Sequence, residues 1–481
     1  MKKTNTRSAS RKVTHINEGY SAKQRKRGSS VRRRNSSSAE RRTEIHRRSS
    51  YEEQMLHASD LEAVNTAPEV VDIQEHVKKR EKKEKQKQKL KFSLEIGGLD
   101  VPFLMLVIML SLVGLVMLFS ASYSAAYYKY GDSLYFIWRQ ALYTIGGFAV
   151  MILVANIPYQ IYHKLAFIAL GVAFVLLILV LLIGDTYNNA TRWLNIAGIS
   201  FQPSEIAKAA VIISFSSLVI RMGDRMKTFV YGVIPFLAIL LMMAALLMKQ
   251  PHLSATIIIC ATGIVILFLG GAHIGKLAVL GIIGVAGALW LVLGMGYGMD
   301  RINVWLDPTI DPLGDGFQSL QSFYAIGSGG LWGLGLGQSR QKHLFIPEPY
   351  NDFIFAIVCE ELGFIGAVLI IILFAALVIR GYYIALRAKN LFGTLLAAGV
   401  ITQIALQTFF NIGVVTGLLP VTGASLPFFS SGGTSTIILF AEMGIVLSVS
   451  KQILAPARIQ REQNKKQKER KSLSEEIKSI R

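Results

Sequence analysis

The sequence predicts an all-α polytopic membrane protein with ten transmembrane helices. Of its 481 residues, 52% are hydrophobic, and the mean hydropathy of +0.43 is high for a soluble protein of this length. The apolar residues also come in blocks of about 20, the length at which a helix spans a bilayer. The net charge of +20 lies mainly in two tails, because residues 1–100 hold 25 Lys and Arg against 14 Asp and Glu, and residues 451–481 hold 10 against 4.

Residues 1–98 are predicted to form a basic cytoplasmic tail. Up to about residue 72 the tail is rich in Ser, Arg, Lys and Asn and too poor in large apolar residues to fold, so we expect disorder. Residues 73–91 favour a juxtamembrane helix. Its basic residues either attract anionic headgroups, at about 1 kcal/mol each, or simply orient the first span. No cleavable signal peptide precedes the first apolar run, which begins near Val101.

The membrane domain is expected over residues 99–450, followed by a basic cytoplasmic tail over 451–481. The ten apolar segments cover residues 102–121, 140–157, 164–183, 203–220, 229–248, 252–271, 275–294, 352–379, 391–412 and 432–450. An even number of spans places both termini on one side. Short connections on that side carry the basic residues Lys164, Arg221, Arg225, Lys227, Lys276, Arg380, Arg387 and Lys389. The positive-inside rule makes that side the cytoplasm, so the large loop at 301–350, between helices 7 and 8, faces outward.

Charged residues inside apolar segments need a partner or a function, because each costs about 2.5 to 3.5 kcal/mol on insertion. Glu205 and Lys208 are three residues apart, on one face of the fourth helix, and can pair with each other. Pro203 suits the first helical turn, and Ser204 can help to cap it. The pair is either a self-neutralising structural contact or part of a polar cavity.

Asp352 ends the outer loop at the mouth of the eighth helix. An Asp in that place is often only an N-cap, but the neighbouring Asn351 can cap the helix instead and free the carboxylate. Partial desolvation at the membrane interface would raise the pKa of Asp352 and make it a better general base. Glu360 and Glu361 lie deeper in the same helix, where structural hydrogen bonding is the simpler interpretation.

Cations predicted on the outer face run against the positive-inside trend and would suit an anionic phosphate or pyrophosphate. They are Arg192, Lys249, Arg301, Arg340 and Lys342. Ordinary loop charge is the alternative for any one of them. The scattered histidines show no metal spacing, and no cofactor is certain; a divalent cation, Mg²⁺ or Mn²⁺, held by carboxylates and lipid phosphates stays open. Cys260 and Cys359 both lie in apolar segments, so we expect no disulfide.

These features suit transfer of a group from a lipid pyrophosphate. Pyrophosphate is a good leaving group that needs mainly charge neutralisation, so one carboxylate base that activates an incoming hydroxyl would be enough. No nucleotide-binding motif is present, and the cluster GSGGLWGLGLG lacks the Lys of a phosphate-binding loop. We interpret this cluster as close backbone packing or a re-entrant turn.

Several long motifs, in order over about residues 100–450, resemble the SEDS family (FtsW, RodA and SpoVE), which polymerises lipid II into glycan strands. These motifs are SAS at Ser120–Ser122, GDSLYFIWRQ from Gly131, RWLNIAGISFQPSEIAK from Arg192, the stretch DPLGDGFQ to EELGFIG from Asp311, and LPVTGASLPFFSSGGTS from Leu419. The first two are more similar to the division branch, FtsW, than to the elongation branch, RodA.

The resemblance implies a ten-helix peptidoglycan glycosyltransferase in the bacterial cytoplasmic membrane, at the division septum, with a class B penicillin-binding protein and other divisome proteins as partners. Asp352 falls on the family's essential Asp. The motifs further imply a substrate cavity lined by Arg192, Gln202, Ser204, Glu205, Lys208, Gln318, Gln338, Lys342 and Glu348.

Two departures from the family pattern stand out. Asn351 replaces the usual Thr before the catalytic Asp, and His252 replaces the Asp of the motif Q-P-D-L-G-T. A role for a carboxylate at residue 252 is therefore in doubt for this chain.

Two other functions compete with the glycosyltransferase. A lipid II flippase would also use an outward cavity, but it needs alternating access, for which the sequence shows no repeat, and it gives Asp352 no chemical task. A non-catalytic division scaffold would act through its tails and its transpeptidase partner.

Overall fold

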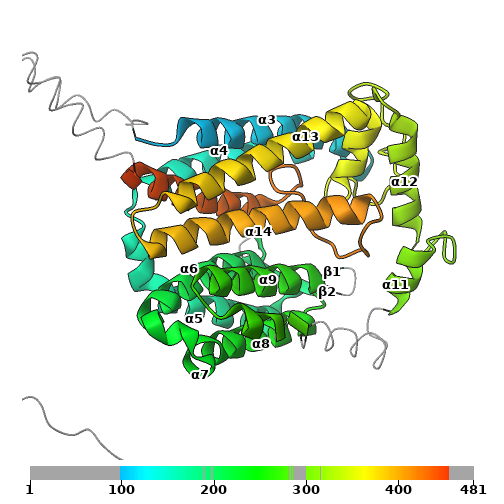
Figure 1. The fold of residues 1–481 in the computed structure, drawn as a ribbon. Coiled ribbons are helices and arrows are strands. Elements are labelled where there is room, and N and C mark those ends of the chain that lie inside the picture. Colours follow the sequence, from blue (N-terminus) through cyan, green and yellow to red (C-terminus); the bar gives the residue numbers. More distant parts are fainter. Residues whose placement is uncertain are drawn as a thin grey trace, which may run out of the picture. The chain divides into compact units, whose positions relative to one another are not determined.

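The computed structural model describes residues 98–187, 190–196, 199–279, 281–282, 284, 299–314 and 316–453. This part of the chain contains eight helices that are long and apolar enough to cross a membrane, as expected for a polytopic membrane protein (Figure 1). The predicted N-terminal tail, most of the C-terminal tail and most of the predicted span 275–294 lie outside the described residues.

The helical unit begins with three long helices and ends with another three. They are α3 (Val101–Tyr130), α4 (Tyr135–Asn156), α5 (Gln160–Ile183), α13 (Ile354–Leu386), α14 (Leu391–Val415) and a C-terminal helix, Gly433–Ile453. Between them lie α6 (Pro203–Met222), η2 (Gly223–Lys227), α7 (Phe229–Gly232), α8 (Ile234–Lys249) and α9 (Leu253–Leu269). The predicted sixth span corresponds to α9, an apolar helix of only 17 residues.

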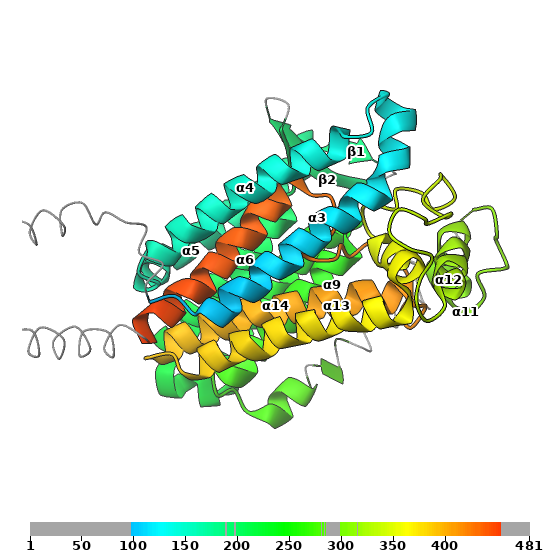
Figure 2. The ribbon, with the colours of Figure 1, turned by 90° about the horizontal axis from the view of Figure 1, so that it is seen from above.

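Small residues let the long helices pack closely. Figures 1 and 2 show α13 running beside both α14 and α3. A Cβ at Gly381 of α13 would lie 2.3 Å from the Ile401 side chain of α14. A Cβ at Gly147 of α4 would likewise lie 2.4 Å from the ring of Phe440 in the C-terminal helix. Larger residues at these two glycines would therefore push neighbouring spans apart.

A small antiparallel sheet departs from the all-α prediction. It contains β1 (Asp185–Tyr187), β2 (Ala190–Ile196) and β3 (Ile199–Phe201), in the order β1-β2-β3. The sheet connects α5 to α6, and Leu194 of β2 pairs with Phe201 of β3. It matters for the site because β2 carries Arg192.

The loop before α13 contains two short helices, α11 (Met299–Leu306) and α12 (Phe317–Gly329), and then docks on a break in α13. Gly363 interrupts α13 with φ 66° and ψ −170°. The break frees two carbonyls, and the amides of Leu334 and Gly335 donate to Glu360 O at 2.9 Å and Glu361 O at 3.0 Å. The glycine-rich segment thus shows the close backbone packing that was one of its two predicted interpretations.

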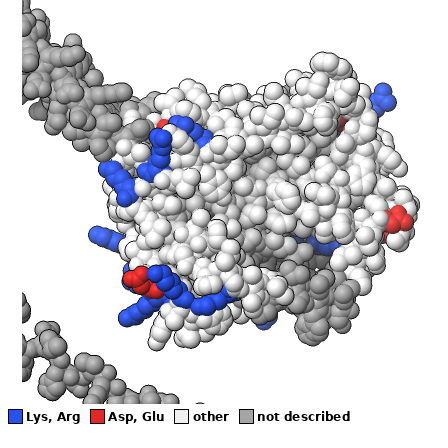
Figure 3. Space-filling view, viewed as in Figure 1, with Lys and Arg blue, Asp and Glu red and all other residues white. Residues whose placement is uncertain are grey.

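Lys and Arg gather at the end of the bundle where α13 ends and α14 begins (Figure 3). The groups at this end include Arg221, Arg380 and Arg387. Arg380 also forms an ion pair of 2.7 Å with Asp100, whose side chain caps α3. This cap fixes the start of the first span against the end of α13.

Candidate active site

Asp352 lies at the opposite end of α13, just before its first residue, Ile354. The N-cap position belongs to Phe353, and no side chain caps the helix. The N-cap interpretation of Asp352 is therefore wrong, and Asn351 does not cap the helix either, because its amide donates to Glu348 Oε2 at 2.9 Å. The Asp352 backbone is held in place by Asn411, whose Nδ2 donates to the Asp352 carbonyl at 2.7 Å.

The guanidinium of Arg192 and the carboxylate of Asp352 both approach Gly423, in the loop before the C-terminal helix. A Cβ at Gly423 would lie 3.4 Å from Asp352 Oδ2 and 3.9 Å from Arg192 Nη1. Arg192 also donates to the carbonyls of Gln250, at 3.4 Å, and Pro251. The β-sheet, the α8–α9 turn and the start of α13 thus meet at one polar site.

Burial raises the pKa of Asp352 to about 6. The Arg192 cation opposes this rise and the Glu348 carboxylate adds to it. A carboxyl group with a pKa near 6 is ionised at neutral pH and is a stronger base than an exposed Asp. The electrostatics therefore match the predicted behaviour of a desolvated general base.

The predicted ion pair between Glu205 and Lys208 is present, at 2.9 Å, near the start of α6. Lys208 is buried and also donates to Gln407 Oε1 of α14 at 3.0 Å. Pro203 is the first residue of α6, as predicted, but Ser204 does not cap the helix. The N-cap is Gln202, without a side-chain hydrogen bond, and the buried Ser204 hydroxyl has no partner among the described residues.

His252 occupies the position of the family's motif carboxylate, just before α9. Its Nε2 lies 3.5 Å from Gln202 Nε2, and its buried Nδ1 has no partner among the described residues. Burial, together with the Arg192 and Lys208 cations, lowers the pKa of His252 to about 3. The imidazole is therefore neutral, and it adds no negative charge beside Arg192.

The remaining predicted residues lie on the loop between α11 and α13. Gln318 Nε2 donates to Pro347 O at 3.3 Å, and Glu348 and Gln338 are exposed. Lys342 is different, because it is buried and forms an ion pair of 3.0 Å with Glu361 of α13. Its charge is thus neutralised within the protein.

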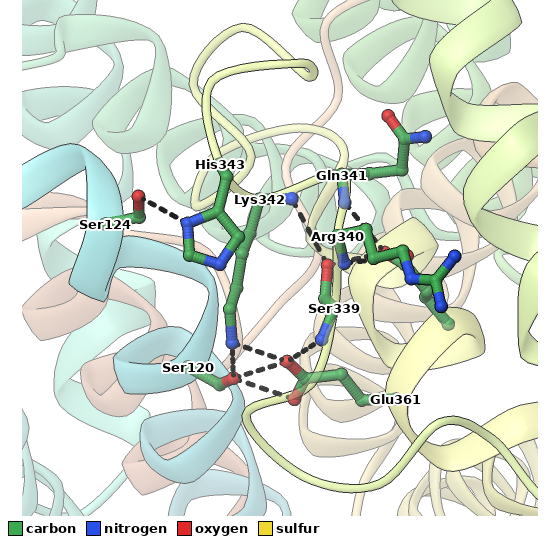
Figure 4. A network of polar contacts seen from close by, with 9 residues as sticks. Ser120, Ser124, Ser339, Arg340, Gln341, Lys342, His343 and Glu361 are labelled. Atoms are coloured by element: carbon green, nitrogen blue, oxygen red, sulfur yellow. Dashed lines mark hydrogen bonds and ion pairs between the residues drawn. The ribbon is translucent and has the colours of Figure 1, made fainter.

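Figure 4 shows the network around this pair. The hydroxyl of Ser120, on α3, lies 2.6 Å from Glu361 Oε1 and 3.1 Å from Lys342 Nζ. The amide of Ser339 donates to Glu361 at 3.2 Å, and that of Arg340 donates to Glu360 at 2.9 Å. The network ties the loop before Asp352 to α3 and α13. Sequence reasoning placed the two glutamates inside the bundle but did not connect them to Lys342 or to Ser120 of the SAS motif.

The fold and the site define a polytopic membrane protein with a carboxylate and a guanidinium at one end of its bundle. A family model described as "Cell cycle protein" (FTSW_RODA_SPOVE) matches residues 101–454, so the chain belongs to the FtsW/RodA/SpoVE family. It is 42% identical over 354 residues to "Stage V sporulation protein E" of Bacillus subtilis (strain 168), covering 73% of this chain and 97% of the relative. It is 38% identical over 364 residues to "Probable peptidoglycan glycosyltransferase FtsW" of Geobacter sp. (strain M18), covering 75% of this chain and 99% of the relative.

Solved structures agree with this assignment. One similar chain comes from a study of the "structural coordination of polymerization and crosslinking by a peptidoglycan synthase complex", with a TM-score of 0.63 and 28% identity over 74% of this chain and 99% of that chain. The rod shape determining protein RodA of Thermus thermophilus is also similar, with a TM-score of 0.56 and 25% identity over 74% of this chain and 98% of that chain.

Proposed function

We propose that this protein is a peptidoglycan glycosyltransferase that polymerises lipid II into glycan strands on the outer face of the bacterial cytoplasmic membrane during cell division. The observation that carries the proposal is the Asp352 carboxylate, which has a raised pKa and shares the space around Gly423 with Arg192. Relatives named as probable peptidoglycan glycosyltransferases match about three quarters of the chain, which supports the same activity here.

The proposed topology has ten spans, both termini in the cytoplasm, and the loop at 301–350 outside. The basic end of the bundle in Figure 3 supports this orientation, because positive residues favour the cytoplasmic side. Asp352, at the other end of α13, would then face the outer leaflet, where a lipid-linked precursor exposes its sugars. Within the membrane, we place the protein at the division septum.

In the proposed reaction, Asp352 removes the proton from a sugar hydroxyl of the acceptor. The hydroxyl oxygen then attacks the anomeric carbon of the donor. The new glycosidic bond forms as the bond from that carbon to the pyrophosphate oxygen breaks, so the configuration inverts and undecaprenyl pyrophosphate leaves. Arg192 neutralises part of the charge that develops on the leaving group. Lys208 and Lys342 are already paired with carboxylates, so their direct contribution to charge neutralisation is small.

We propose that a divalent cation, Mg²⁺ or Mn²⁺, would bind together with the substrate, whose pyrophosphate supplies most of its ligands. Among the described residues, no group of three or more His, Cys, Asp or Glu side chains could hold a metal ion. Pyrophosphate oxygens and water would supply its ligands, because the Asp352 carboxylate acts as the base in this mechanism. When bound, the ion would neutralise pyrophosphate charge.

The proposed partner is a class B penicillin-binding protein that crosslinks the strands, together with other divisome proteins. The similarity to a chain from a peptidoglycan synthase complex supports this partnership.

The test is polymerisation of lipid II by the purified full chain with its cognate penicillin-binding protein. We expect Asp352→Asn to lower the rate by about 10²–10⁴-fold, the usual contribution of a general base. Asp307→Asn is the matched control, because Asp307 is an exposed carboxylate on the same loop and, among the described residues, its side chain accepts hydrogen bonds from Thr309 alone. Glu205→Ala tests the contribution of the Glu205–Lys208 ion pair. Folding of this variant must be checked, because the change leaves Lys208 buried without its carboxylate.

Each alternative function predicts a different result. If Asp352→Asn polymerises as fast as the wild type, Asp352 is not the base and the mechanism is refuted. A chain that never polymerises but moves lipid II across a bilayer is a flippase. A chain that does neither, yet supports division unless residues 1–90 are removed, is a scaffold.

A further inference from the structure

A cavity with a largely aromatic lining lies beside Asp352. It has a volume of about 290 Å³ and is formed by the outer ends of α3 and α4, the β-sheet, and residues 350–351 and 431–433. One of its lining residues is Asn351, the immediate neighbour of Asp352. None of its lining residues belongs to the cavity predicted from the family motifs. We call it the α3–α4 pocket.

The pocket and Asp352 are parts of one hydrogen-bonded structure. The amide of Ser431 donates to Tyr350 O at 2.9 Å, and the Ser430 hydroxyl donates to Asn351 O at 2.8 Å. A molecule bound in the pocket would therefore hold a fixed position relative to Asp352.

Residues 431–433 line the pocket and are held against α4. Gln140 accepts from the amide of Gly432 at 3.2 Å, and its own amide donates to Thr436 at 2.9 Å. A Cβ at Gly433 would lie 3.0 Å from the ring of Tyr143, so a glycine there lets the chain lie directly on that ring. The amides of Ser431 and Gly432 are both satisfied within the protein, so hydrogen bonds to a ligand would come from the side chains that line the pocket.

Aromatic rings form much of the wall. Tyr130 and Tyr135 stack with their centroids 3.9 Å apart, and Phe136 packs on Tyr350 at 4.3 Å. Trp193 lines the cavity from β2. Such rings combine an apolar face with a polar edge, which suits the C–H face and the hydroxyls of a pyranose.

Two cations give the pocket its charge. Lys129 lies over the ring of Tyr130 at 5.6 Å, and Arg139 over that of Tyr135 at 5.3 Å. No Asp or Glu lines the pocket, and neither cation forms an ion pair within the described part of the chain. An Arg held against an aromatic ring is well placed to bind a carboxylate.

From this geometry we propose that the α3–α4 pocket binds an N-acetylhexosamine glycan that carries a carboxylate. The aromatic wall takes the sugar rings, and Arg139 with Lys129 takes the carboxylate of the attached peptide. The inference rests on the proposed function for the identity of the polymer, but it concerns binding alone. The pocket would hold the glycan that enters or leaves the reaction at Asp352.

The probe is a soluble disaccharide-pentapeptide without lipid or pyrophosphate. Its binding to the purified full chain is followed by fluorescence, with Trp193→Phe used to identify the signal that comes from the pocket. We expect Arg139→Gln and Lys129→Gln each to weaken binding about 5- to 10-fold. The matched control, Lys389→Gln, removes an exposed cation that does not line the pocket and leaves the affinity unchanged. An uncharged chitin oligosaccharide should bind more weakly than the probe and show no loss in Arg139→Gln.

The outcomes separate this inference from the proposed function. The Asp352→Asn chain should bind the probe as well as the wild type, even when it no longer polymerises lipid II. Equal affinity in the wild type, Arg139→Gln and Lys129→Gln would overturn the inference. So would a pocket that binds inorganic pyrophosphate and not the disaccharide-pentapeptide. If binding follows the prediction but Asp352→Asn still polymerises, the pocket stands and the proposed mechanism fails.

Discussion

Glu361→Gln is the change that best tests how the loop before α13 is held. Glu361 and Lys342 form a buried ion pair of 3.0 Å, with side chains 0% and 4% exposed. Removing one partner of a buried pair typically costs about 3–5 kcal/mol, because the other charge stays buried and unpaired. Glutamine keeps the shape and can still accept a hydrogen bond from Ser120 or Ser339, so we expect the lower end, about 3 kcal/mol.

This cost should appear locally, as easier opening of the loop. The amide of Ser339 donates to Glu361 and is protected only while the network is closed. At about 1.4 kcal/mol per factor of ten, a loss of about 3 kcal/mol raises its hydrogen exchange rate by about 100-fold, up to the limit set by local opening. The assay is hydrogen exchange with mass spectrometry on peptides covering residues 334–346, with peptides of α14 as an internal reference.

A double-mutant cycle checks the physical cause. Lys342→Met alone should also speed the exchange, but Lys342→Met with Glu361→Gln should cost less than the sum of the two, by roughly 1–3 kcal/mol, because no charge is left unpaired. Glu348→Gln, at an exposed carboxylate on the same loop, is the matched control. Additive effects in the cycle, or equal exchange in Glu361→Gln and Glu348→Gln, would refute the argument that the buried pair anchors the loop.

Two further predictions concern the pH dependence and the glycine-rich loop. The polymerisation rate should rise with pH through about 6, because Asp352 must lose its proton to act as a base. The Glu348 carboxylate raises the pKa of Asp352 and the Arg192 cation lowers it, so Glu348→Gln should move this limb to lower pH and Arg192→Gln should move it to higher pH. The measurement is the pH–rate profile of each variant, and shifts of the opposite sign would contradict the prediction. Gly333→Ala should detach the loop and lower thermal stability, because its Cβ would lie 2.2 Å from an α13 carbonyl. Gly337→Ala has a similar positive φ but open space around it, so thermal unfolding should show a smaller loss.

Eight of the ten predicted spans appear as long apolar helices among the described residues. They were predictable because hydropathy follows directly from the transfer of side chains into lipid. The pairing of Glu205 with Lys208 was predictable for a similar reason, since a spacing of three residues on a helix fixes which side chains meet. Both predictions needed only local geometry, and the structure confirms the ion pair.

The β-sheet and the Lys342–Glu361 network that anchors the loop could not be predicted from local geometry. The strands are short, with three residues in β1 and in β3, which is too few for an alternating pattern to indicate a strand. The Glu361 network joins residues 241 and 19 positions apart in the chain. A single sequence shows that a buried carboxylate needs a partner, but it does not show which of several distant Lys or Ser residues supplies it.

The break in α13 at Gly363 was likewise not predictable from the sequence alone. A glycine within an apolar helix is usually tolerated, so the sequence alone gave no reason to expect a break there. The break is stable because the Leu334 and Gly335 amides satisfy the carbonyls that the helix no longer uses.

Buried charges in this bundle cost energy on insertion, and those that the protein satisfies itself hold elements together. Lys208 joins α6 to α14 through Gln407, and Glu361 joins α13 to α3 through Ser120. Asp352 does not follow this pattern. Among the described residues its carboxylate accepts no hydrogen bond and forms no ion pair, although its backbone is fixed by Asn411. A fixed backbone with an unused, partly desolvated carboxylate is a costly arrangement for structure alone, but it is the one that a general base requires.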